Sequence, residues 1–108
     1  MSKINVEDNV KKCAMVSIMN VIRGKWSIPI IYALHSGTLR FKALERCLPN
    51  INTRMLVKEL KNLEAQGVVE RKAYATVPPT VEYSLSPKGK KLVPILENLC
   101  MWGIEFLD

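Results

Sequence analysis

Residues 51–67 read INTRMLVKELKNLEAQG, and the remainder of the chain is organised around this stretch. Read as a helix, it places Leu56, Leu60 and Leu63 on one stripe, because residues three and four apart share a helix face. Asn52 can cap the first turn, and Gly67 can end the helix in the left-handed conformation. The opposite side carries Thr53, Arg54, Val57, Lys58 and Lys61. The stretch therefore predicts a helix with an apolar back and a cationic front.

Two interpretations of this cationic front are open. Arginine and lysine contact phosphates and guanine in the major groove of DNA, and threonine contacts base edges or phosphate, so the face suits a recognition helix. Charged outer faces are also normal on amphipathic helices that bind nothing. The segments before and after this helix distinguish a recognition helix from an ordinary amphipathic one.

Composition favours a small globular protein with an anionic partner. The chain has 108 residues, of which 48% are hydrophobic and 24% charged, which is typical of one folded domain spanning residues 1–108. Its formal net charge of +6 favours nucleic acid first and an acidic membrane surface second. No apolar run approaches the roughly 18 residues that a membrane span needs. Residues 1–12 lack the apolar core of a signal peptide, so we expect a cytoplasmic protein.

The cysteines predict neither a disulfide framework nor a zinc site. Cys13, Cys47 and Cys100 are far apart and odd in number, which fits a reducing compartment. Cys13 follows Lys11 and Lys12 near the start of a predicted helix, and both features favour the reactive thiolate. A redox-sensing Cys13 and a passive, partly buried Cys13 are both compatible with this pattern. Cys47 and Cys100 lie on apolar stripes, where we expect them to pack.

The segments before the basic helix predict three helices, the last of which forms a helix-turn-helix with the basic helix. A first helix is expected at about residues 9–22, and a second one begins with Ser27 as its cap and ends at Gly37. Residues 42–48 form a short third helix, separated from the basic helix by a Pro-Asn turn. The pair spans about residues 42–66 and has the arrangement of a helix-turn-helix.

A hairpin is expected next. Residues 68–74 and 81–85 are rich in β-branched and aromatic residues, and Pro78 with Pro79 restricts the segment between them to a loop. The brief stretch 38–41 before the helix-turn-helix is a further candidate strand. Two helices followed by a hairpin, here a wing at about residues 68–86, is the order of a winged helix-turn-helix. The predicted fold is thus mainly α with a small β-hairpin.

A long closing helix is expected at about residues 87–107. Ser86 supplies a cap, Pro87 suits the first helical position, and Pro94 can kink the helix. Apolar residues crowd most of its circumference, more than one small domain covers easily. A second copy of the chain, packed helix against helix, is the economical partner for this surface.

Several short motifs, in order and at matching spacings, resemble the HxlR family of bacterial transcription regulators, which are winged-helix proteins akin to the MarR type. The resemblance covers roughly residues 13–103. Its motifs are Gly24-Lys25-Trp26, Leu39-Arg40-Phe41, Leu48-Pro49-Asn50-Ile51, Gly67-Val68-Val69-Glu70-Arg71 and Val77-Pro78-Pro79-Thr80-Val81-Glu82-Tyr83-Ser84-Leu85. The resemblance implies a homodimer held by the first and last helices, with two recognition helices reading a pseudo-palindromic operator. Some members of this family are thiol sensors, so the resemblance also favours a redox-sensing role for Cys13.

The chain departs from the family pattern at three places, one of which is Thr76, where an acidic residue is common in the wing loop. Cys13 precedes Ala14 where proline is usual, and Thr80 stands in the wing where arginine is common. The wing tip thus lacks a cation, which makes Lys72 and Tyr74 at the wing base the better candidates for DNA contact. The complete set of expected DNA contacts is Arg40, Lys42, Asn52, Thr53, Arg54, Val57, Lys58, Lys61, Lys72 and Tyr74.

Other functional classes fit the sequence less well. His35 is the only histidine, and no carboxylate pair, phosphate loop or metal-ligand spacing accompanies it, so we expect no enzyme, metal or cofactor. A winged-helix protein-interaction module without specific DNA binding is the alternative. A small-molecule or electrophile effector is compatible with a regulator, with the methionines Met15, Met19 and Met101 as candidate lining. Methionine at helical spacing is more often core.

Overall fold

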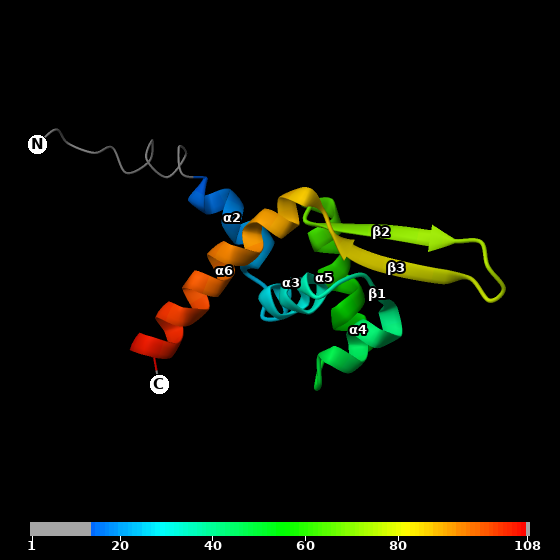
Figure 1. The fold of residues 1–108 in the computed structure, drawn as a ribbon, viewed down its shortest axis with the longest axis horizontal. Coiled ribbons are helices and arrows are strands. Elements are labelled where there is room, and N and C mark those ends of the chain that lie inside the picture. Colours follow the sequence, from blue (N-terminus) through cyan, green and yellow to red (C-terminus); the bar gives the residue numbers. More distant parts are fainter. Residues whose placement is uncertain (1–13, 108) are drawn as a thin grey trace, which may run out of the picture.

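The computed structural model describes residues 14–107 as a winged helix with one added helix at each end (Figure 1). Five helices and three strands follow one another along this part of the chain. They are α2 (Met15–Ile22), α3 (Ser27–His35), β1 (Leu39–Arg40), α4 (Phe41–Cys47), α5 (Thr53–Ala65), β2 (Val69–Tyr74), β3 (Thr80–Leu85) and α6 (Pro87–Phe106). The predicted fold, mainly helical with a small antiparallel sheet, is confirmed. Residues 9–13 of the expected first helix lie outside the described residues.

Both ends of α5 are formed by the residues that the sequence indicated. The side-chain oxygen of Asn52 accepts a hydrogen bond from the backbone N–H of Met55 at 2.7 Å. Gly67 has a φ of 76°, and the N–H of Val68 bonds to the carbonyl of Leu63 at 3.0 Å. These contacts satisfy backbone groups that a helix end leaves without partners, and so they fix the length of α5.

The core lies between α3, α5, the sheet and the first half of α6. Leu56, Leu60 and Leu63 of α5 are buried against it, as their spacing predicted. Burial of one such side chain stabilises the fold by about 1.5–3 kcal/mol. The other buried hydrophobic residues of this cluster are Ile30, Ile31, Leu34, Leu44, Leu48, Val68, Val69, Leu85, Val93 and Leu96.

The start of α3 differs from the prediction that Ser27 caps it. Trp26 occupies the cap position without a side-chain hydrogen bond, and Ser27 is the first helical residue. Its buried hydroxyl donates instead to Oε2 of Glu59 on α5 at 3.1 Å. The prediction was wrong because a buried carboxylate, which needs a hydrogen-bond partner, lies within reach of the hydroxyl.

The sheet has three strands, the two of the expected hairpin and β1, which lies within the candidate strand at residues 38–41. Its order is β1-β3-β2, and both pairs are antiparallel. Leu39 pairs with Tyr83 and Arg40 with Glu82, so β1 satisfies backbone groups along one edge of β3. The extra strand joins the segment before α4 directly to the wing.

Helix α6 packs on the body through its first half, and just beyond it the carboxylate of Glu97 accepts a hydrogen bond from the hydroxyl of Tyr32 on α3 at 3.3 Å. Ser86 caps it by accepting the N–H of Gly89 at 3.0 Å, while its hydroxyl donates to the carbonyl of Gly67 at 2.6 Å. Its buried residues are Gly89, Val93 and Leu96. Beyond them the helix extends away from the winged-helix body, on the side opposite the wing (Figure 1).

Two cysteines lie differently from the expectation that they pack. Both Cys47, at the end of α4, and Cys100, in the second half of α6, are exposed. Cys100 lies where the apolar side chains of α6 are exposed, and Cys47 lies beside the buried Leu44 and Leu48 without being covered itself. Among residues 14–107 we find no helix that is long and apolar enough to cross a membrane.

Candidate nucleic-acid interface

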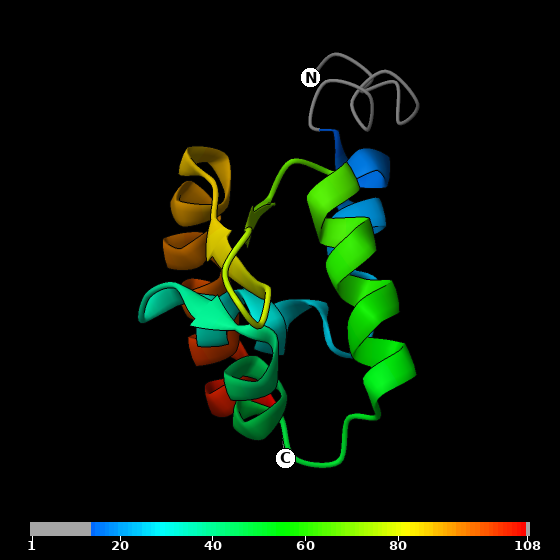
Figure 2. The same cartoon turned by 90° about the vertical axis from the view of Figure 1, so that its right-hand side faces the viewer.

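The outward face of α5 carries the cations that the sequence assigned to it. Arg54, Lys58 and Lys61 are exposed, and Val57 between them is 36% exposed. They face outward because the leucine stripe on the other side of the helix is held in the core. Figure 2 shows α5 running along one side of the molecule, with the wing projecting beside it.

The first two candidates of α5 have structural partners. The hydroxyl of Thr53 donates to Oε2 of Glu45 on α4 at 2.7 Å, and Asn52 caps the helix. Both residues are exposed, but these contacts tie the start of α5 to α4 and to its own first turn. Their side chains therefore orient the helix in this structure.

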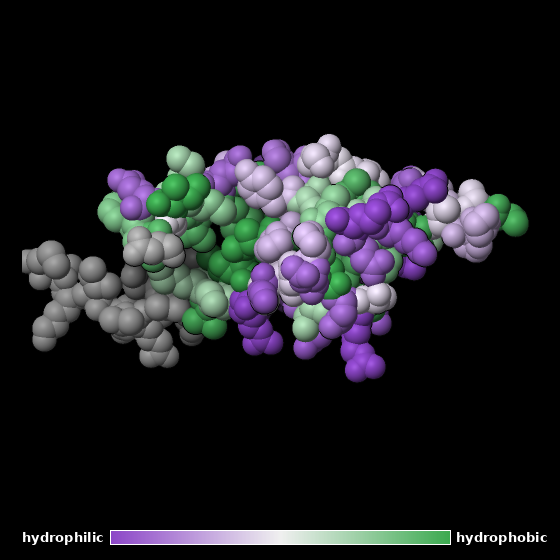
Figure 3. All heavy atoms as spheres, turned by 90° about the horizontal axis from the view of Figure 1, so that it is seen from below, coloured by the Kyte–Doolittle hydropathy of each residue, from purple (hydrophilic) through white to green (hydrophobic). Residues whose placement is uncertain are grey.

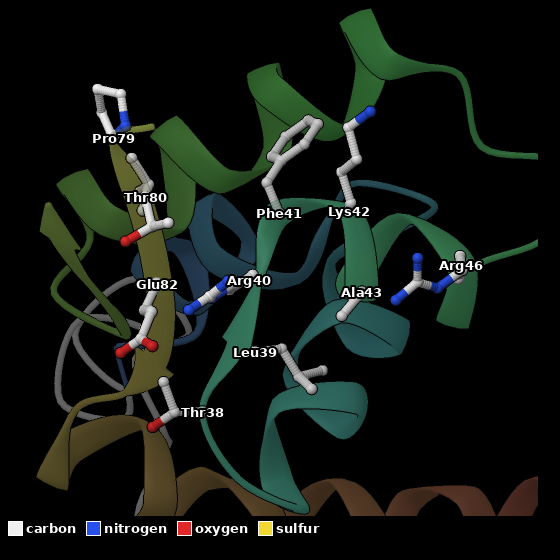
Figure 4. A pocket seen from close by; sticks show the side chains of 11 residues that line it. Thr38, Leu39, Arg40, Phe41, Lys42, Ala43, Arg46, Pro79, Thr80 and Glu82 are labelled. Atoms are coloured by element: carbon white, nitrogen blue, oxygen red, sulfur yellow. The ribbon is translucent and has the colours of Figure 1, made fainter. Parts of the chain in front are cut away.

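Arg40 and Lys42 line a groove between α4 and the wing. The groove has a volume of about 710 Å³, and its opposite wall is formed by Pro79 through Glu82 of β3 and the loop before it. Figure 4 shows Arg40 extending from β1 toward the strand that carries Glu82, with Arg46 farther along α4. Arg46 is a third cation of this groove that sequence reasoning missed. Its spacing of four residues from Lys42 on one helix was the available signal.

The two faces of the wing carry different cations. Lys72 pairs with Glu82, and its Nζ lies 5.3 Å from the ring centroid of Tyr74. Arg71 pairs with Tyr83, and successive strand residues point to opposite faces. The structure therefore does not bring Lys72 and Tyr74 together with α5, and it brings Arg71 there instead.

A cleft between α5 and the wing contains this arginine. It has a volume of about 260 Å³ and is lined by Val57, Leu60, Lys61, Glu64, Arg71 and Tyr83. Val69, two residues earlier on β2, is buried, and side chains two apart on a strand share a face. This alternation was the feature of the sequence that could have indicated Arg71. Sequence reasoning missed it because an isolated strand does not show which of its faces is turned inward.

A second cleft lies along the other edge of α5. It has a volume of about 320 Å³ and is lined by Arg23, Gly24, Lys58, Glu59 and Asn62. Asn62 donates from Nδ2 to the backbone carbonyl of Asn20 on α2 at 2.9 Å. The joint between α2 and α3 is thus held directly against α5. Sequence reasoning missed Arg23, since nothing in the order of the chain brings this joint beside the basic helix.

Comparison with known proteins decides the family. The family model described as HxlR-like helix-turn-helix matches residues 21–108. The chain belongs to the HxlR family. It is 46% identical over 91 residues to YkvN of Bacillus subtilis, an uncharacterized HTH-type transcriptional regulator, a match that covers 84% of this chain and 77% of YkvN.

Two solved structures extend the likeness to three dimensions. A putative MarR-family transcriptional regulator from Porphyromonas gingivalis W83 superimposes with a TM-score of 0.82 and 38% identity, covering 98% of this chain and all of that one. The redox regulator HypR in its oxidized form superimposes with a TM-score of 0.79 and 41% identity, covering 89% of this chain and 99% of HypR. This HxlR protein is thus a transcriptional regulator with a winged helix-turn-helix.

The ionisable groups beside α5 form a cationic surface. Within residues 14–107, no three His, Cys, Asp or Glu side chains lie close enough to hold a metal ion. The negative charge of Glu97 and the hydrogen bond to it raise the pKa of Tyr32, which lies on α3 beside α6. That pair joins two helices outside the cationic face of α5.

Proposed function

We propose that the protein is a sequence-specific, double-stranded DNA-binding transcriptional regulator that acts as a homodimer on a pseudo-palindromic operator. The observation that carries this proposal is the exposed cationic face of α5, on a helix whose other face is anchored in the core. A rigid helix of this kind presents its side chains to base edges without a large ordering cost.

Each group of residues has a separate role in this proposal. Arg54 and Val57 face bases, since arginine binds guanine in bidentate fashion and an apolar side chain contacts the thymine methyl group. Lys58 and Lys61 contact phosphates beside them. Arg40 and Lys42 contact phosphate from the groove between α4 and the wing. Asn52 and Thr53 fix the start of α5, and through it the register on DNA.

The exposed apolar surface of the two added helices supports the homodimer. On α6, Ile95, Leu99, Met101, Trp102, Ile104 and Phe106 are each between 48% and 75% exposed. On α2, Met15, Val16, Ile18 and Met19 are exposed as well. Figure 3 shows apolar surface gathered toward the end of the molecule that lies away from the wing. An apolar surface of this extent favours a protein partner, and a two-fold axis lets one surface cover its own copy.

A thiol signal is the favoured form of regulation. The similarity to HypR, which is a redox regulator, supports it. Cys13 is the first candidate from sequence, but it lies outside the described residues. Cys47 and Cys100 are exposed and so are accessible to oxidants within one chain. Oxidation with diamide is expected to change operator affinity, and a Cys13→Ser variant is expected to lose that response. An unchanged affinity of the wild-type protein would contradict the thiol signal.

Selection of bound sequences from a random duplex library tests the function directly. The expected result is an inverted repeat with half-sites about 34–36 Å apart, as for a dimer that reads two successive major grooves. Affinity for that repeat is expected to fall linearly on a double logarithmic plot against salt concentration. An unenriched library would contradict the proposal and would favour a winged-helix module that binds protein rather than DNA.

A further inference from the structure

The two clefts along α5 have the same construction. Each one combines a lysine of α5 with an arginine from a flanking segment: Lys61 with Arg71 of the wing, and Lys58 with Arg23 of the joint between α2 and α3. All four side chains are exposed. Since Lys58 and Lys61 are three residues apart, they lie roughly 60° apart around the outward face of the helix, and each one lines the cleft on its own side.

The major groove of DNA is bordered by two phosphate backbones, which match the two cationic clefts in number and position. It is about 12 Å wide, and a helix with its side chains is about 10–12 Å across, so an inserted helix has a sugar–phosphate backbone close to each edge. A cleft on each edge that is lined by two cations has the charge and position to receive one of these backbones. The flanking segments then extend the contact beyond the width of α5 itself.

On this basis we infer that α5 is bracketed by two phosphate sites, one formed by Lys61 and Arg71 and the other by Lys58 and Arg23, which bind the two backbones that border one major groove. The inference rests on the proposed DNA-binding function and adds Arg23 and Arg71 to it. It replaces Lys72 as the cation of the wing base, because Lys72 lies on the sheet face that is turned away from α5.

Each cleft also contains one acidic residue, and the two are expected to affect phosphate binding differently. Glu59 is only 9% exposed, and its carboxylate accepts the hydroxyl of Ser27, so it lies below the cations and holds the cleft together. Glu64 is exposed at the rim of the cleft beside the wing. Its charge opposes that of Lys61 and Arg71. Glu64→Gln is therefore expected to strengthen binding to every duplex severalfold.

The test measures operator and scrambled duplex affinity over a salt series for Arg23→Gln, Arg71→Gln and the double variant. Each phosphate contact contributes about 0.9 to the slope of log affinity against log salt concentration. A homodimer loses two contacts per substitution, so each single variant is expected to flatten the slope by roughly 1.8 and the double variant by roughly 3.6. Operator and scrambled duplex are expected to weaken equally, because phosphates carry no sequence information.

Three controls make the result specific. Lys90→Gln removes the same charge on α6, beside His35 and Ser84 on the sheet face away from α5, and is expected to leave the slope unchanged. Arg23→Lys and Arg71→Lys are expected to restore the slope, since a lysine still neutralises a phosphate. Circular dichroism and thermal unfolding of each variant establish that it is folded.

The outcomes separate the two proposals. Wild-type protein that binds the operator, with arginine variants whose slopes match Lys90→Gln, would overturn the bracketing sites and leave the DNA-binding function standing. A wild-type protein without salt-dependent duplex binding would overturn both. A slope that flattens for only one of the two arginines would contradict the bracketing of α5.

Discussion

At the scale of single residues, Glu59 connects α5 to the remainder of the protein. The sequence placed it between Lys58 and Leu60, at the border of the apolar stripe, and gave no reason to single it out. In the fold it is buried and accepts the hydroxyl of Ser27. Its contact crosses 32 positions of the chain, and helical periodicity carries no information at that separation. The caps of α5 could be predicted because they depend on neighbours in sequence.

Gly24→Ala is expected to destabilise the fold through Glu59. A Cβ at position 24 would lie between 2.5 and 2.8 Å from atoms of the Glu59 carboxyl group. The carboxylate must move to make room, and because it is buried and accepts the hydroxyl of Ser27, the move disturbs that hydrogen bond. The expected cost is about 1–3 kcal/mol of unfolding free energy, to be measured by urea titration. In a Glu59→Ala background the same substitution is expected to cost little. An equal cost in both backgrounds would contradict the contact.

Asn52→Ala is expected to lower the unfolding free energy by about 1 kcal/mol, because it removes the cap of α5. Asn52→Ser is the matched control, since its hydroxyl can accept the same N–H of Met55. Urea titration measures both. If the alanine variant proves as stable as the serine variant, the cap has no energetic role.

At the scale of elements, the helices follow from periodicity and the sheet only in part. Apolar spacing and end signals placed α5 and α6, because a helix is determined by its own residues. Strand β1 has two residues and no period of its own, so its pairing with β3 depends on tertiary structure. For the same reason Lys72, and not Arg71, was predicted as the cation of the wing that contacts DNA. Only the sheet in contact with α5 defines which face of the wing is inward.

Arg54→Ala is expected to separate base reading from backbone binding on α5. If Arg54 binds guanine in bidentate fashion, its loss costs about 1–3 kcal/mol of binding free energy at one operator position. Affinity for scrambled duplex should change little by comparison. Fluorescence anisotropy with operators substituted at each position measures this. A loss that is equal at every position would assign Arg54 to phosphate instead.

At the scale of the whole molecule, the wing and the second half of α6 extend in opposite directions from the core (Figure 1). One end is apolar and the other is flanked by cations, so a single chain has two surfaces of different chemistry. The sequence predicted this division from the broad apolar circumference of the last helix. The geometry of the partner could not be predicted, because it depends on how two such surfaces pack.

Trp102→Glu is expected to dissociate the proposed homodimer. Trp102 is 53% exposed on α6, and a charge buried without a partner in an interface costs several kcal/mol. Sedimentation equilibrium is expected to show a monomer, with operator affinity reduced at the same time. Lys91→Glu, which introduces the same charge in the first half of α6, is expected to remain a dimer. A dimeric Trp102→Glu protein would exclude this part of α6 from the interface.

The spacing of half-sites tests the central claim, that two copies of α5 enter successive major grooves on one face of the duplex. Affinity is to be measured for operators whose selected half-sites are moved apart by half a helical turn and by a full turn. We predict that the half-turn insertion, about 5 base pairs, removes the gain in affinity over a single half-site, since it turns one half-site to the opposite face. Equal affinity for the original and the half-turn operator would contradict the claim.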